Sequence, residues 1–310
     1  MPRKHKLIRK CNWCEKQFET NSLHQETCSR SCGISLLRQR ELEMNEKEGI
    51  MQVWACGGGV QSTAIAVLIC QGKLPTPDFA WIVDVGYEKS KTFDYVKSTI
   101  IPRLSEIGVR LKIIRTIDYF DNSLFDATNN VRLPLYEKGN DGIVRKYKTH
   151  CSGTWKQRVA HHWLREQGVK RCDTWIGISV DEMRRIKISS VKWNQNKYPL
   201  VDLGIRREDC IDLIARAGWP KPEHTSCYLC PNQPDFQWQD LKENYREDWE
   251  RAVGFDEYIR SINPNLFLHT SCKPLKDKAF DTKYTNKFFV GKECFGDCES
   301  IVEEGGGSNL

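Results

Sequence analysis

From Met51 onward the sequence alternates between short apolar runs and helix-forming segments, and this alternation constrains the fold more than any other feature. We predict strands at residues 51–56, 79–83, 109–114 and 174–178, and helices at residues 62–71, 92–107 and 154–167. Apolar strands that alternate with helices are typical of a parallel, doubly wound α/β sheet. Ligands of such sheets bind at the carboxyl ends of the strands, so functional residues are expected directly after each strand.

The first predicted strand runs into the segment Cys56-Gly57-Gly58-Gly59-Val60-Gln61-Ser62-Thr63. Glycines let a backbone approach a phosphate closely, and the N–H groups and positive dipole end of the following helix favour its charge. The segment lacks the Gly-Lys-Ser/Thr end of a Walker loop and the spacing of a dinucleotide fingerprint. Taken alone, it is compatible with a phosphate-binding loop and equally with an ordinary tight turn.

Length and composition set outer bounds on the chain. Its 310 residues allow one substantial domain and a smaller appendage, and its formal net charge of +6 is compatible with a nucleic-acid partner. No apolar run is long enough to span a bilayer and no signal-peptide core follows the basic N-terminus, so we expect a cytoplasmic protein without a membrane partner. Several of the fourteen cysteines stand in close pairs, which in such a protein favours metal binding or redox chemistry over disulfides.

Two cysteine pairs, Cys11/Cys14 and Cys28/Cys32, frame a short N-terminal segment. Four thiolates in two close pairs suit a tetrahedral structural zinc ion, whose binding would supply the folding energy that so short a segment lacks. The alternative is four unliganded thiols. Basic residues flank the pairs and form either a contact for a nucleic-acid backbone or a solvated face. With the charged helical run that follows them, we predict a zinc module at residues 1–48.

Charged residues follow two of the predicted strands. Asp84-Val85-Gly86 comes after the second strand, where the carboxylate would hold a ribose or a metal ion or would cap the next helix. Arg184 and Arg185 follow the strand at 174–178, and two adjacent arginines can clamp a phosphate or sulfate, although a solvated turn has the same composition. Between them, Lys156 lies in a basic run that enters a helix.

A second set of cysteines lies in the main domain. Cys227-x2-Cys230-Pro is a good metal-loop signal, and Cys151 and Cys210 would complete a four-thiolate site. Zinc and an iron–sulfur cluster both fit these four positions, and His150 is an alternative ligand. Cysteines that occur singly are as well explained as buried thiols.

In combination, these segments resemble the PP-loop (N-type ATP pyrophosphatase, adenine nucleotide alpha-hydrolase-like) superfamily, and within it the phosphoadenosine-phosphosulfate (PAPS) reductase-like branch. Residues 57–62 align with the family loop Ser-Gly-Gly-x-Asp-Ser, with Gly57 in place of the first Ser and Gln61 in place of Asp. Asp84-Val-Gly…Thr92 resembles the segment Asp-Thr-Gly…Glu-Thr, and Cys151…Lys156 with Cys227-x2-Cys230 resembles the split cysteine motif of adenylyl-sulfate reductases. The resemblance covers about residues 50–262, and the N-terminal segment resembles small treble-clef zinc fingers.

The resemblance implies a doubly wound PP-loop domain at 49–270 that binds ATP or a PAPS-like nucleotide with Mg²⁺, followed by an irregular, partly disordered extension at 271–310. The nucleotide would be held by the loop and the next strand end, that is, by Gly57, Gly58, Gly59, Gln61, Ser62, Thr63, Asp84 and Gly86. Asp84, Lys156, Arg184 and Arg185 would serve adenylyl or sulfur transfer by positioning groups and neutralising charge. The acceptor would be tRNA, DNA or a base, and a thiol or persulfide protein would be the sulfur donor.

Two other functions remain open at this stage. Gln61 and the cysteine layout also suit a PAPS or adenylyl-sulfate reductase that releases sulfite, although the segment around Cys294 and Cys298 departs from the family's redox motif. The third reading is a non-catalytic, zinc-dependent nucleic-acid-binding protein with a vestigial nucleotide fold.

Overall fold

The centre of the fold is a five-stranded parallel sheet, seen in a computed structural model that describes residues 7–22, 24–121, 123–124, 132–147 and 151–280. Its strands stand in the order β5-β4-β3-β8-β9. Their bounds are β3 Met51–Ala55, β4 Phe79–Asp84, β5 Leu111–Arg115, β8 Cys172–Ile176 and β9 Asn194–Lys197. The structure thus confirms the predicted α/β class with a central parallel sheet.

The strand order reverses beside β3. From β3 the chain proceeds to β4 and β5 on one side, whereas β8 and β9 extend the sheet on the other side. Strands β3 and β8 are parallel neighbours, with Met51 opposite Cys172 and Ala55 opposite Ile176. In doubly wound sheets, ligands bind in the crevice at such a switch point, outside the carboxyl ends of the strands. The glycine loop after β3 lies at that point.

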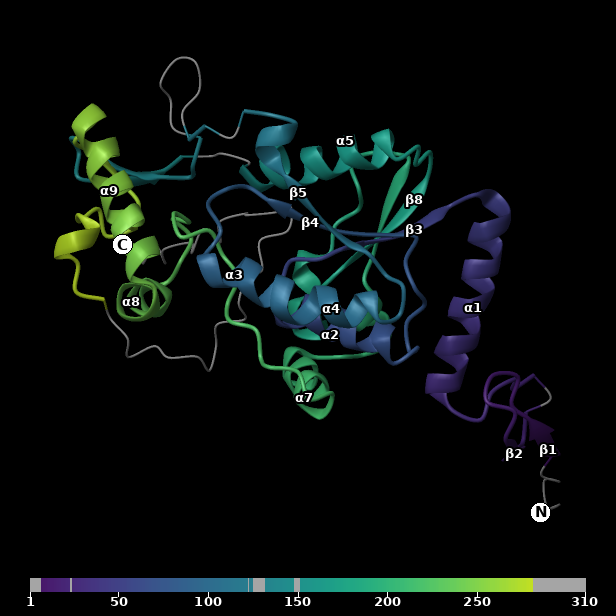
Figure 1. The fold of residues 1–310 in the computed structure, drawn as a ribbon. Coiled ribbons are helices and arrows are strands. Elements are labelled where there is room, and N and C mark those ends of the chain that lie inside the picture. The colour runs from purple at the N-terminus through teal and green to yellow at the C-terminus, as the bar shows by residue number, and fades with distance from the viewer. Residues whose placement is uncertain (1–6, 23, 122, 125–131, 148–150, 281–310) are drawn as a thin grey trace, which may run out of the picture.

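Helices cover both faces of this sheet (Figure 1). Helix α5 (Arg158–Glu166) packs on one face, and helices α2 (Val60–Cys70), α4 (Ile101–Ser105) and α7 (Arg207–Arg216) lie on the other. Successive strand residues point to opposite faces, so Val53 contributes to the core under α5 and Trp54 to the core around α2. Burial on both faces explains why β3 and β4 read as largely apolar runs in the sequence.

Two of the predicted helices contain π-helical segments. The helical path after β4 consists of α3 (Ser90–Tyr95), the π segment η1 (Val96–Ile100) and α4. The π segment η3 (Gly153–Gln157) leads directly into α5. Because π-helical segments often occur at functional sites, Lys156 and Gln157 in η3 are candidates for a functional role.

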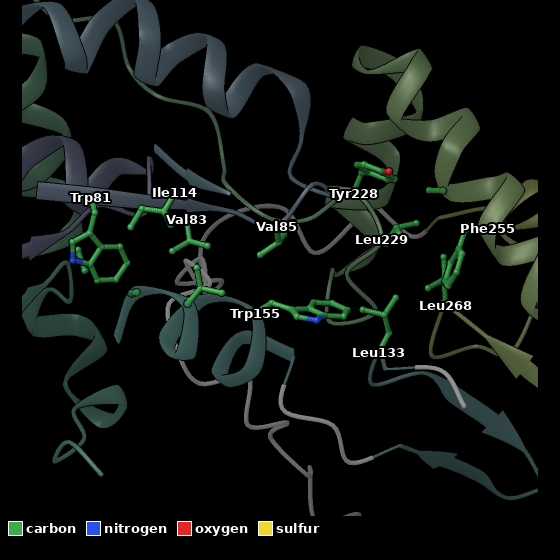
Figure 2. Close-up of a cluster of buried hydrophobic side chains, with 14 of the residues drawn as sticks. Trp81, Val83, Val85, Ile114, Leu133, Trp155, Tyr228, Leu229, Phe255 and Leu268 are labelled. Carbon is green, nitrogen blue, oxygen red and sulfur yellow. The ribbon is translucent and has the colours of Figure 1, made fainter. Parts of the chain in front are cut away.

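The C-terminal helices extend the core that lies under α5. Helices α8 (Asp235–Asn244) and α9 (Arg246–Ile262) lie beside a small antiparallel sheet of order β10-β6-β7, with β6 Tyr136–Lys138, β7 Val144–Lys146 and β10 Leu266–Phe267. Figure 2 shows the buried side chains running from Trp81 in the central sheet to Phe255 in α9. Leu275 belongs to the same core, so the packed region extends past the predicted boundary at residue 270. Residues 281–310, including Cys294 and Cys298, lie outside the described residues.

The N-terminal part of the chain contains a small sheet of its own and a long helix. An antiparallel hairpin of β1 (Leu7–Lys10) and β2 (Gln17–Thr20) precedes helix α1 (Arg30–Glu48), which leads to β3. Over the described residues, no helix has the length and apolar character required to cross a membrane. The remaining short elements are η2 Thr116–Asp118, η4 Val180–Arg185, α6 Pro199–Asp202 and η5 Leu275–Asp277.

Candidate functional site

The glycine loop between β3 and α2 is arranged for an anion. Gly58 adopts a φ of +76°, and a Cβ on it would stand 3.1 Å from Thr92 Cγ2, so this position needs glycine for both conformation and space. The Gly57 N–H donates to Ser62 Oγ over 2.8 Å and folds the loop against the helix. The first turn of α2 contains no acidic side chain. Its N–H groups and the helix dipole are therefore directed at the crevice without a competing carboxylate.

Gly177, directly after β8, closes the other side of this loop. A Cβ at this position would stand 3.1 Å from the Ser62 backbone nitrogen and 3.2 Å from Ser62 Oγ. Only a glycine lets the end of β8 come this close to the first turn of α2. The sequence analysis did not select Gly177 as a site residue, although its place directly after an apolar strand was a usable signal.

The side chain of Gln61 points away from the loop, into a buried polar network. It is fully buried; its Oε1 accepts from Arg207 Nη1 at 2.7 Å, and its Nε2 donates to Glu182 Oε2 at 3.0 Å. Arg185 Nη1 donates to the same Glu182 oxygen at 2.9 Å. Burial raises the pKa of Glu182, and Arg185 opposes that rise. Gln61 therefore links α2, α7 and the segment after β8, and Arg185 pairs with Glu182 within that segment, whereas Arg184 is exposed.

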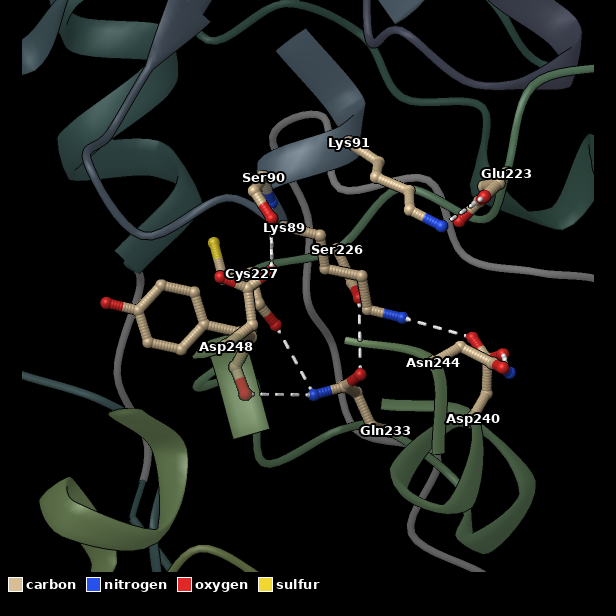
Figure 3. Close-up of polar contacts among 11 residues, drawn as sticks. Lys89, Ser90, Lys91, Glu223, Ser226, Cys227, Gln233, Asp240, Asn244 and Asp248 are labelled. Carbon is tan, nitrogen blue, oxygen red and sulfur yellow. Dashed lines mark hydrogen bonds and ion pairs between the residues drawn. The ribbon is translucent and has the colours of Figure 1, made fainter. Parts of the chain in front are cut away.

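Asp84 ends β4 at the same edge of the sheet as the glycine loop. Its Oδ1 accepts the Gly86 N–H at 2.7 Å, which closes a tight turn, and the helix-capping role considered above does not apply. The Ser90 N–H and hydroxyl at the start of α3 instead donate to Asp248 Oδ2 in α9, each at 2.9 Å (Figure 3). Asp84 is half-buried at this edge of the sheet.

Glu88 connects the glycine loop to the cysteine loop, and the sequence analysis missed it. Its Oε1 lies 2.6 Å from Lys156 Nζ, and both side chains are largely buried. Its Oε2 accepts a hydrogen bond from the Cys227 thiol at 3.7 Å, and an antiparallel β-bridge pairs the backbones of Glu88 and Cys227. Gly57, Glu88 and Lys156 all line one small cavity. An acidic residue between a strand end and the next helix was a signal for Glu88.

The loop that carries Cys227 and Cys230 is fixed by several hydrogen bonds. The Cys230 N–H donates to the Cys227 carbonyl at 3.0 Å, and Gln233 Nε2 donates to that same carbonyl at 3.3 Å. Figure 3 shows Ser226 and Gln233 beside this loop, with Lys89 extending toward Asp240. Burial lowers the pKa of Lys89, and the carboxylate of Asp240 opposes that shift.

The predicted set of four central cysteines is not brought together as a set. Cys151 and Cys227, both partly buried, pack against the core under α5, whereas Cys210 in α7 is fully buried in the core around α2. Cys210 therefore packs in a different core from the one that Cys227 contacts, and its place in a four-thiolate site with Cys227 stays a prediction. Nor do the sulfurs of Cys151, Cys227 and Cys230 gather as tightly as those at the N-terminus, the one cysteine group within 4.8 Å that the described residues contain. His150 lies outside the described residues.

The N-terminal cysteines do form a compact metal-ligand group. The sulfurs of Cys11, Cys14, Cys28 and Cys32 all lie within 4.8 Å of one another, and the Cys14–Cys28 and Cys28–Cys32 pairs are 3.5 Å apart. Ligands at 2.3 Å in a tetrahedron around zinc stand about 3.8 Å apart, so these residues fit a zinc ion. Burial raises the pKa of the Cys11 thiol, but hydrogen bonds from the backbone N–H groups of Cys14, Cys28 and Trp13 outweigh it and lower that pKa to about 6. Hydrogen bonds with Cys14 and Cys32 raise the pKa of Cys28 to about 12.

Part of the basic surface of this module is already neutralised. Lys10 pairs with Glu15 at 3.1 Å and Arg40 with Glu26 at 3.0 Å, and all four side chains are exposed. Exposed pairs of this kind contribute about 0–1 kcal/mol each to stability. These pairs therefore add little to the stability of the module, and they reduce the positive potential that it presents to a nucleic acid.

Comparisons with known proteins gave a fold likeness and no family assignment. No protein-family model matches the chain, and no curated protein matches it. Among solved structures, it is similar to the U34-tRNA thiolase NcsA from Methanococcus maripaludis with its 4Fe–4S cluster (15% identity over 81% of this chain and 87% of that chain, TM-score 0.39). It is also similar to a PAPS reductase from Candida auris in a phosphate complex (15% identity over 65% of this chain and 91% of that chain, TM-score 0.36). At these identities and TM-scores, the likeness says nothing about the function of this chain.

Proposed function

We propose that this chain is an enzyme that binds an adenine nucleotide, ATP or a PAPS-like compound, and catalyses adenylyl or sulfur transfer onto a nucleic acid or base. The observation that carries the proposal is the convergence of three segments at the carboxyl edge of the sheet. Gly57 of the glycine loop, Glu88 and Lys156 line one cavity, and the Cys227 thiol donates a hydrogen bond to the Glu88 carboxylate at 3.7 Å. Phosphate binding, charge neutralisation and a sulfur atom are thereby supplied within a single site.

The phosphates of the nucleotide are held by the backbone N–H groups of residues 58–62 at the start of α2. Lys156 supplies the positive charge that neutralises the phosphates during transfer, and Glu88 fixes the position of its ammonium group. The second oxygen of Asp84 binds the ribose or a Mg²⁺ ion at the end of β4. Arg184 and Arg185 lie after β8, where Arg184 is exposed to an incoming acceptor.

For the cysteines we propose two different metal centres. The N-terminal group binds zinc, because its sulfurs already have the spacing of a tetrahedral site. Cys151, Cys227 and Cys230 bind an iron–sulfur cluster, whose thiolate ligands are held by several irons and need not have the spacing of a single tetrahedral ion. A cluster at this place would supply sulfur or redox chemistry to the neighbouring crevice.

The test of the nucleotide chemistry is pyrophosphate release from ATP, with and without tRNA or DNA. The proposal expects release that depends on an acceptor and that falls in Lys156→Ala and Gly58→Ala. Sulfite formation from PAPS, without pyrophosphate release from ATP, would replace the transferase by a reductase. If neither pyrophosphate nor sulfite forms under any condition while the protein still binds nucleic acid, a non-catalytic nucleic-acid-binding function is favoured.

The metal proposal is tested by iron, sulfide and zinc content after anaerobic purification. We expect one zinc per chain that is lost in Cys14→Ser, and iron that is lost in Cys227→Ser. Cys210→Ala is the matched control, and it should keep both metals because Cys210 packs in a different core from the one that Cys227 contacts. A colourless protein that contains two zinc ions would refute the cluster.

A further inference from the structure

A second cavity lies between helix α5 and strands β8 and β9. Its apolar wall is formed by Trp81, Ala160, Leu164, Ile176 and Ile178. The lining of this cavity and that of the glycine-loop cavity have Trp81 in common and no other described residue. The two cavities are therefore neighbours with different walls, and the second one has no role in the function proposed above.

The polar lining of this cavity carries amides and hydroxyls and no carboxylate among the described residues. The uncharged groups are Gln157, His161, Thr174, Asn194, Asn196 and Tyr198. Two cations, Arg185 and Lys187, complete the lining. Such a cavity favours an uncharged ligand with several hydrogen-bonding atoms that is attached to a negatively charged group, and it disfavours a cation.

His161 presents a neutral ring with a defined proton position. Burial lowers its pKa, and the nearby charges of Arg165 and His162 lower it further. Thr174 Oγ1 donates to Asn194 Oδ1 at 2.6 Å, and Asn194 Nδ2 lies 3.4 Å from His161 Nε2. Because Nδ2 of the amide is a donor, Nε2 of the ring accepts and the ring proton is on Nδ1. The ring is thus held as a hydrogen-bonding group and not as a charge.

Gln157 is the lining residue whose amide remains available to a ligand. It forms no hydrogen bond with another described residue, in contrast to Asn194, Asn196 and Tyr198. It follows Lys156 in the π segment η3, so consecutive residues line the two neighbouring cavities. A glutamine amide offers one acceptor and two donors in a plane, which is the geometry used to bind the edge of a base bidentately.

We propose that this cavity binds the nucleobase of the acceptor, an uncharged planar heterocycle. The amide of Gln157 contacts the base edge, the apolar wall contacts the base face, and Arg185 and Lys187 lie beside the attached phosphate. The inference rests on the proposed function and specifies its acceptor as a nucleotide unit. It places the acceptor base one tryptophan side chain away from the cavity that holds Lys156 and the glycine loop.

The experiment titrates the full-length protein with the four ribonucleoside 5′-monophosphates, with and without saturating non-hydrolysable ATP, by calorimetry or saturation-transfer NMR. We expect at least one monophosphate to bind with unchanged affinity when ATP is present. Gln157→Ala should weaken that binding about tenfold or more, in the range of a lost bidentate amide–base contact, and should leave ATP affinity unchanged. Gln167→Ala, the same substitution at the exposed end of α5, is the matched control and should change neither affinity. Circular dichroism melting verifies that each variant is folded.

Two results would overturn the inference, and both differ from failure of the proposed function. If ATP and the monophosphate compete and Gln157→Ala weakens ATP binding, the cavity belongs to the adenine of the nucleotide. Absence of monophosphate binding at millimolar concentration would remove the base site altogether. Gly58→Ala tests the glycine loop independently, because it should weaken ATP and leave the monophosphate unaffected.

Discussion

Replacement of Gly58 by alanine tests the glycine loop. The substitution has two free-energy costs, one from the backbone conformation and one from steric overlap of the new Cβ. Gly58 has a φ of +76°, and this left-handed conformation costs a non-glycine residue about 1–2 kcal/mol. A Cβ there would also stand 3.1 Å from Thr92 Cγ2 and 3.4 Å from Val96 Cγ2, and overpacking of a buried site costs about 1–3 kcal/mol. We therefore expect Gly58→Ala to lower the free energy of unfolding by about 2–5 kcal/mol, the sum of the two terms.

Gly108 provides the matched control. It has a φ of +78°, and a Cβ on it would meet nothing within 4 Å, so Gly108→Ala incurs the conformational cost alone. Urea denaturation of both variants should show Gly58→Ala less stable than Gly108→Ala by about 1 kcal/mol or more. Equal destabilisation would refute the close approach of Thr92. An unchanged ATP affinity in folded Gly58→Ala would exclude the loop from the nucleotide site.

Three further predictions concern the buried charges and the zinc module. Lys156→Met leaves the buried carboxylate of Glu88 without its cation and should cost about 3–5 kcal/mol in urea unfolding, whereas adding Glu88→Gln in the same chain should recover most of this loss. Burial, with the charges of Lys89 and Arg207, lowers the pKa of His224 from 6.5 to about 3, so the unfolded chain binds a proton that the folded chain does not, and stability should fall as the pH decreases from 6.5 toward 3. His224→Phe should flatten that pH dependence and His162→Gln, at an exposed site, should not; an unchanged slope in His224→Phe would contradict the assignment. Chelation of zinc should remove hydrogen-exchange protection from residues 7–32 and leave β3 and β8 protected, and simultaneous loss of both would show that the module is not independent.

The sequence predicted the parts of the fold whose residues are buried on both sides. Strands β3 and β4 are largely apolar and β8 is buried throughout, because helices cover both faces of the sheet. Strand β9 was not predicted, since Asn194-Gln-Asn-Lys197 is polar and lies at the edge, where it exists through its pairing with β8. The three strands of the small sheet have two or three residues each, which is too short for a periodic pattern.

The candidate site was predictable where it follows from topology and unpredictable where it depends on the direction of a side chain. The glycine loop, Asp84 and Lys156 lie at the carboxyl edge because parallel strands end there together. The spacing of cysteines carries no information about the core in which each one packs, and Cys210 and Cys227 contact different cores. Gln61 replaces an acidic residue of the family loop, and its amide is engaged in a buried network with Arg207 that no local pattern indicates.

The positions of the glycine loop and the cysteine loop are fixed by one short backbone segment. The Lys89 N–H donates to the Ser226 carbonyl at 3.1 Å, and the Thr92 N–H donates to the Lys89 carbonyl at 3.0 Å. The methyl group of Thr92 in turn occupies the space that Gly58 leaves free. A shift of the cysteine loop would therefore move Thr92 and with it the wall of the glycine loop. We therefore expect a ligand at one loop to change the affinity of the other loop for its own ligand, and the same factor must act in the reverse direction.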